Sequence, residues 1–113
     1  MRNGQLVLVV CKIRMGAFSG ERVFELRMAG AQGDYIGIAP VDHCLDANRN
    51  PLGRDQPPTG VEIDGFVEAF LIANGGVEAR IELPDGEAIR VPVEQVQYQK
   101  EFDRGSTYVP IRP

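Results

Sequence analysis

The side chains best suited to covalent chemistry in this chain are two thiols, Cys11 and Cys44, and one imidazole, His43. A thiol nucleophile needs a base within hydrogen-bond reach and a further group that orients the base. His43 and Cys44 are adjacent, and neighbouring side chains of an extended segment point to opposite sides. Cys11 and His43 meet only if their strands pair, and no oxyanion site is evident beside them. We therefore predict that the protein is not an enzyme, and we keep catalysis by Cys11 with His43 as an alternative.

Metal and cofactor ligands are sparse. A structural zinc site uses four nitrogen or sulfur ligands at short spacings, whereas only His43 and Cys44 occur close together here. The next segment has four oxygen-bearing side chains, those of Asp46, Asn48, Asn50 and Asp55. No glutamate follows them at the position that a calcium loop requires. The glycine-containing segment 15–20 lies between two predicted strands, not before a helix, so it does not resemble a phosphate-binding loop. We expect no metal, no cofactor and no small-molecule substrate.

One carboxylate lies in an otherwise apolar strand. Glu68 interrupts the segment 66–73, which is apolar on both faces and therefore suits the centre of a sheet. Such a group is either a general acid of raised pKa or half of an ion pair. We favour the ion pair, with Arg14 or Arg27 as the partner.

The stretch from 61 to 96 has the most regular pattern in the chain. Apolar residues alternate with polar ones from Val77 to Leu83, which is typical of a half-buried strand. The alternation resumes at Ile89 after the turn 83–86, whose Pro, Asp and Gly suit a tight reversal. Asn74-Gly75-Gly76 forms the other turn, since its central residues tolerate positive φ. These features predict a three-stranded meander.

The first half repeats this pattern. Residues 21–26 match 78–83, and residues 33–44 match 86–96 with Ala39 as one extra residue. This alignment predicts an inward-facing group of side chains, namely Phe24, Leu26, Met28, Ile36 and Ile38. Tyr35 and Gly37 then fall on the outer face, where Tyr35 either covers a loop, which we favour, or forms a shallow hollow beside Gly37 in which a partner could sit. Any two amphipathic hairpins look alike, so a chance likeness remains the alternative interpretation.

The predicted organisation is one domain over residues 1–113. It contains pseudo-repeats over 5–45 and 66–96, a loop over 46–60 rich in Pro, Asn, Asp and Gly, and a C-terminal tail over 103–113. A single 3₁₀ turn is expected within 40–45. The fold class is all-β, either a small barrel or two fused half-barrels, with about seven short strands.

Charge and hydropathy restrict the partners. The net charge is −4, with seven basic and six acidic residues in 1–60 but five and ten in 61–113. No basic footprint of the kind that nucleic-acid binding requires is evident, so nucleic acid is an unlikely partner. It is kept as an alternative, in which Lys12, Arg14, Arg22 and Arg27 would form one patch for nucleic acid or the ribosome. No apolar run is long enough to span a bilayer, and we expect a cytoplasmic protein without a membrane partner.

Two segments of like form carry a resemblance to a known fold. Residues 37–44, GIAPVDHC, and 89–96, IRVPVEQV, each end a strand at a proline before a predicted turn. This resembles the end of SH3-like small β-barrels, in which a 3₁₀ turn and a last short strand follow. The chain has no Trp and no acidic-aromatic loop, so the resemblance implies the fold and no functional residues.

The sequence therefore predicts a non-catalytic module that binds a protein partner or a second copy of itself. Four apolar or aromatic side chains are the candidate contacts, namely Phe18, Tyr35, Tyr108 and Ile111. Phe18 lies in the loop 15–20, where we expect burial over the barrel end, with an exposed interface anchor as the alternative. The tail 103–113 is expected to dock on the barrel or on a neighbouring chain.

Overall fold

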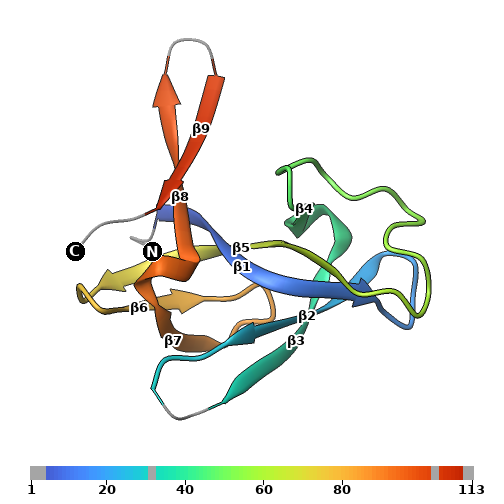
Figure 1. Ribbon diagram of the computed structural model, residues 1–113, viewed down its shortest axis with the longest axis horizontal. Helices are drawn as coiled ribbons and strands as arrows, with labels where there is room; N and C mark the ends of the chain where they lie inside the picture. The colour runs from blue at the N-terminus through green and yellow to red at the C-terminus, as the bar shows by residue number, and fades with distance from the viewer. Residues whose placement is uncertain (1–4, 31–32, 103–104, 111–113) are drawn as a thin grey trace.

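The computed structural model describes residues 5–30, 33–102 and 105–110, and for 98–102 and 105–110 it describes the backbone alone (Figure 1). Within these ranges the protein is all-β, as predicted, with antiparallel strands curled into a strongly curved half-barrel and no α-helix. The strands are β1 (Gln5–Met15), β2 (Glu21–Arg27), β3 (Asp34–Pro40), β4 (Cys44–Asp46), β5 (Ile63–Asn74), β6 (Glu78–Glu82), β7 (Ala88–Pro92), β8 (Val96–Phe102) and β9 (Gly105–Pro110). Two 3₁₀ turns, η1 (Val41–His43) and η2 (Val93–Gln95), precede β4 and β8.

The two long strands β1 and β5 form the centre of the sheet. They pair antiparallel from Gln5–Leu71 to Ile13–Ile63. The sheet then extends from β1 through β2 to β3, and from β5 through β6 to β7. Val, Leu and Ile crowd both faces of β1, because its inner face enters the main core and Leu8 on the outer face packs with Leu45 and Phe66. Burial on both faces explains the continuous apolar run in the sequence.

The order of elements occurs twice. The series β1–β2–β3–η1–β4 recurs as β5–β6–β7–η2–β8. The last strand of each series crosses to the other half, since β4 pairs with β5 and β8 pairs with β1. Even single hydrogen bonds recur: Val41 N donates to Gly20 O, and Val93 N to Val77 O, both at 2.9 Å. Each half therefore depends on the other to complete its sheet.

The predicted inward face of β3 is wrong. Ile36 and Ile38 are 55% and 52% exposed, whereas Ala39 is buried and Tyr35 packs on the core. β2 and β3 pair without a bulge from Glu21–Pro40 to Arg27–Asp34, so Ala39 is not an extra residue. A one-residue shift in alignment turns every side chain to the other face. Gly37 faces inward, where a Cβ would lie 2.6 Å from Phe24 Cζ.

The described chain contains nine strands instead of about seven. The first addition, β4, follows the predicted 3₁₀ turn. The second, β9, comes from the tail: residues 105–110 pair with β8, from Phe102–Gly105 to Gln97–Pro110. β8 pairs with β1 only through residues 96–98, and beyond them the β8–β9 hairpin projects from the half-barrel (Figure 1).

The loop 46–60 is fixed to the sheet by Arg22. Its side chain is fully buried on the inner face of β2, although the sequence analysis had placed it in a possible surface patch. A guanidinium has five N–H donors, and all five are used here on backbone carbonyls. The acceptors are the oxygens of Ser19, Glu21, Gly53, Arg54 and Gln56, at 2.7, 2.7, 3.1, 2.9 and 2.7 Å. Four of these five carbonyls lie in the two loops, so Arg22 satisfies backbone groups that no neighbouring strand can reach, and the fifth belongs to Glu21 at the start of β2.

Replacing Arg22 by Lys should destabilise the fold strongly. An ammonium has three donors at one point and cannot reach acceptors on both loops. Carbonyls left without a donor are costly when buried, so we expect the free energy of unfolding to fall by about 3 kcal/mol. Urea denaturation followed by circular dichroism measures this change. The control is Arg54→Lys, whose side chain is exposed and which should shift stability by less than about 0.5 kcal/mol; equal effects of both variants would contradict the role given to Arg22.

Candidate functional site

Of the four predicted contact residues, the structure describes the side chains of Phe18 and Tyr35 alone, and these two lie at opposite ends of the β2–β3 hairpin. Phe18 is 70% exposed at the tip of the β1–β2 loop, so the expectation of burial is wrong. Tyr35 is half-buried against the core. Tyr108 lies in β9, opposite Gln99 of β8, and Ile111 falls outside the described residues. A role of these residues in binding a partner stays a prediction.

Tyr35 joins the two halves instead of lining an open hollow. Its hydroxyl donates a hydrogen bond to Asp85 Oδ2 at 2.5 Å, in the turn between β6 and β7. Its ring packs at a centroid distance of 6.0 Å from Phe24. Burial, and then the hydrogen bond to Asp85, raise the pKa of the Tyr35 phenol far above its usual range. The hydroxyl therefore remains a donor, and the contact closes the open side of the half-barrel.

Both cysteines are buried and unpaired, as expected for structural residues. Burial, with Cys44 nearby, raises the pKa of the Cys11 thiol far above its usual range. Burial also raises the pKa of the Cys44 thiol, to about 12. A thiol of raised pKa is a poor nucleophile near neutral pH, because the thiolate is the reactive form. These environments do not favour chemistry at either sulfur.

His43 meets a carboxylate, not a thiol. Its Nδ1 lies 3.0 Å from Glu68 Oε1, and both side chains line a hollow of about 270 Å³ on the edge of the core. The sequence had suggested Arg14 or Arg27 as the partner of Glu68. The structure shows that Glu68 pairs with His43 instead. Arg14 lies near Glu25 and Glu62, and Arg27 near Glu94. Cys11 lines a different hollow, so no Cys11–His43 site is formed.

The hollow at His43 has a counterpart in the other half, next to η2. The pairing registers of the two halves match His43 with Gln95, Glu68 with Val10 and Ala69 with Cys11. Gln95, Val10 and Cys11 line a hollow of about 350 Å³. There Gln95 Nε2 donates to Arg27 O at 2.9 Å. The two hollows lie at equivalent positions in the two halves, but different polar groups line them. The histidine–carboxylate pair occurs only in the hollow at His43, because Gln95 and Val10 take the equivalent positions in the other.

The four basic residues that the nucleic-acid alternative requires, Lys12, Arg14, Arg22 and Arg27, do not form a positively charged patch. Arg22 is buried, and Lys12 Nζ contacts Asp64 at 2.6 Å. Arg14 and Arg27 lie within 4 Å of carboxylates, as described above. Among the described basic residues, these four are neutralised in place and offer no continuous positive surface.

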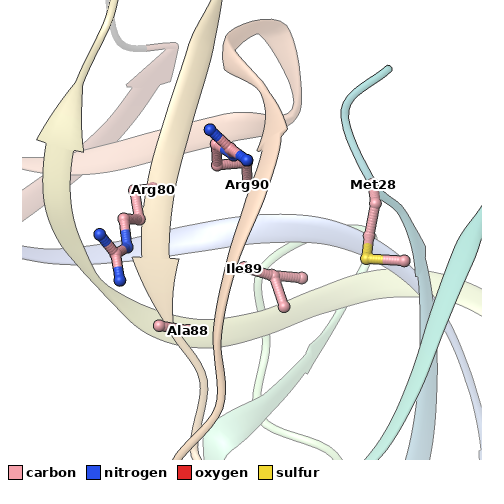
Figure 2. Close-up of a pocket in the computed structure, with 5 residues that line it drawn as sticks. All are labelled: Met28, Arg80, Ala88, Ile89 and Arg90. Carbon is pink, nitrogen blue, oxygen red and sulfur yellow. The ribbon is translucent and has the colours of Figure 1, made fainter. Parts of the chain in front are cut away.

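A different basic pair lies on the β6–β7 hairpin. Arg80 and Arg90 are exposed and directly opposite one another across the two strands. They line a hollow of about 350 Å³ with Met28, Ala88 and Ile89 (Figure 2). Sequence analysis missed the pair, although a signal was present: both residues fall on the outer face of the predicted hairpin. Finding it required the register across the turn.

Comparison with known proteins gives no relative: no family model, no curated protein and no solved structure matches the chain. In the part of the chain that the structure describes, no cluster of three or more His, Cys, Asp or Glu side chains is placed to hold a metal ion. The same residues include no helix long and apolar enough to cross a membrane. The function therefore has to be argued from the surface geometry.

We expect both thiols to resist modification in the folded protein. Burial and raised pKa values keep them protonated and covered, so a disulfide reagent at pH 8 should react far more slowly with native than with urea-unfolded protein. Release of the coloured thiolate measures the rate. Phe18→Ser is a suitable control, since a surface change should leave the rate unaltered; rapid reaction of one native thiol would revive the enzyme alternative.

Proposed function

We propose that this protein is a non-catalytic small β-barrel module that binds protein, and that its partner is a second copy of the same chain. The strand–proline–3₁₀–strand series at 34–46 and 88–102 supports assignment to the SH3-like type of small barrel. In both series the proline before the turn has φ −59°. Because small barrels of this type host many unrelated functions, the fold alone does not define the partner.

The observation that carries the proposal is the open edge of β3. Among the described residues β3 pairs with β2 alone. Ile36 and Ile38 are more than half exposed on it, next to the half-buried Val23 of β2. Natural edge strands are usually protected by charges, bulges or covering segments, because an open apolar edge templates pairing with another chain. From Tyr35 to Ala39, β3 contains no charged residue.

The edge is self-complementary. If two copies of β3 pair antiparallel about Gly37, then Ile36 of each chain lies opposite Ile38 of the other. Asp34 then lies opposite Pro40, so no like charges meet. This arrangement has the twofold symmetry of an isologous dimer, and apolar β-branched pairs across strands are favourable. A second copy therefore fits the edge better than an acidic or basic partner does.

The other end of the strand order is protected. Among the strands that the structure describes, β7 pairs with β6 alone, but Ala29 N donates to Arg90 O at 2.9 Å and occupies part of its free edge. Arg90 is exposed and Pro92 lacks an N–H. Both features disfavour strand addition. The contrast between the two equivalent edges makes β3 the expected interface.

Self-association is tested by light scattering coupled to size-exclusion chromatography over a range of concentrations. We expect the wild-type protein to approach twice the 12.4 kDa mass of one chain. Ile38→Lys should return it to the monomer mass, because paired strands would bury two ammonium groups near the twofold axis.

The matched control is Val77→Lys, since Val77 is 79% exposed but lies outside β3. That variant should associate like the wild type. A wild-type protein that stays monomeric at every concentration would refute the dimer. Loss of association in both lysine variants would show that the effect is not specific to the edge of β3.

A further inference from the structure

Arg80 and Arg90 form an exposed pair of like charges on the β6–β7 hairpin. They are direct partners across the β6–β7 ladder, so their Cβ atoms lie about 4.5–5.5 Å apart on one face. Like charges opposite one another destabilise a sheet. Neither guanidinium lies within 4 Å of a carboxylate among the described residues. The pair therefore costs stability in the isolated protein.

The pair differs from most of the other basic side chains that the structure describes, and Arg54, which is also exposed, is not one of a pair. Lys12, Arg14 and Arg27 lie within salt-bridge distance of carboxylates. Arg22 is buried among carbonyls, and Arg49 donates to Gln97 and stacks over the Phe66 ring at 5.2 Å. In a chain of net charge −4, two adjacent cations with no carboxylate partner in the part of the chain that the structure describes are suited to an anion.

The surroundings favour a compact anion. Two hollows, of about 350 and 320 Å³, share Arg80 and Arg90 in their walls. In the first, Ile89 and Met28 face one another and form an apolar side (Figure 2). Glu78 and Glu82 flank Arg80 along β6 on the same face. Carboxylates on both sides repel an extended polyanion, whereas a small anion can sit between the guanidinium groups.

We propose that Arg80 and Arg90 bind a phosphomonoester group. Each guanidinium can donate two parallel hydrogen bonds to a tetrahedral oxyanion. A phosphomonoester carries a charge of about −1.5 to −2 near neutral pH, which matches two arginines better than a single carboxylate does. The site is distinct from the proposed interface between copies, since none of the residues that line its two hollows belongs to β3.

Inorganic phosphate is the probe, titrated at constant ionic strength into protein observed by amide NMR. We expect saturable shifts in β6 and β7, with affinity reduced roughly tenfold or more in Arg80→Gln and in Arg90→Gln. Arg54→Gln is the control, since Arg54 is an exposed arginine of the loop 46–60 and should bind as the wild type does. Acetate should bind more weakly than phosphate.

Thermal unfolding provides a readout that a structural role would not give. Because the arginines repel one another, Arg90→Gln should leave the unfolding midpoint unchanged or raise it. Tighter binding of O-phosphoserine than of phosphate would support a phosphate carried on a larger molecule, and equal binding would support phosphate itself. Shifts that do not saturate, equal binding of acetate, an equal loss in Arg54→Gln, or a lowered midpoint in Arg90→Gln would overturn the proposal.

Discussion

The antiparallel ladder between β1 and β5 is the interaction on which the rest of the fold depends. Each half contributes one long strand to it, and each half ends with a short strand on the partner's long strand, β4 on β5 and β8 on β1. Val67 shows the consequence, since it pairs with Val9 on one side and with Cys44 on the other. Buried backbone groups must be hydrogen-bonded. The pairing of β4 with β5 and of β8 with β1 provides partners for those of the two long strands. Neither half would have a complete sheet alone.

Side-chain hydrogen bonds fix the loops and the edge strand that the β1–β5 ladder does not itself hold in place. Arg22 ties the loops 15–20 and 46–60 to β2 through five carbonyls, and Tyr35 ties β3 to the turn before β7 through Asp85. The position equivalent to Arg22 in the second half is Ala79, which is also buried. The second half has a short turn, residues 75–77, where the first has a longer loop. The guanidinium is thus the group that allows one half to carry long irregular segments.

The two halves have the same order of elements but unlike surfaces. At one cross-strand position the first half has Val23 opposite Ile38, and the second has Arg80 opposite Arg90. The registers of the two hairpins make these pairs equivalent. At this position the first hairpin is therefore apolar, whereas the second carries two cations. Different cross-strand pairs at this one position thus change the outer surface without altering the core.

The sequence alone determined the strands with strict alternation, the turns rich in Gly, Pro and Asn, and the 3₁₀ turn after Pro40, because each depends on local backbone preferences and a period of two. It also indicated that Cys11 belongs to the core. It could not determine which face of β3 is buried, because that depends on pairing register with β2, and a one-residue error in aligning the halves reversed Ile36 and Ile38. The burial of Arg22, the partner of Glu68 and the meeting of Arg80 with Arg90 were decided only by tertiary structure. Each joins residues from separate strands or loops, and their proximity is a product of chain folding that no local pattern records.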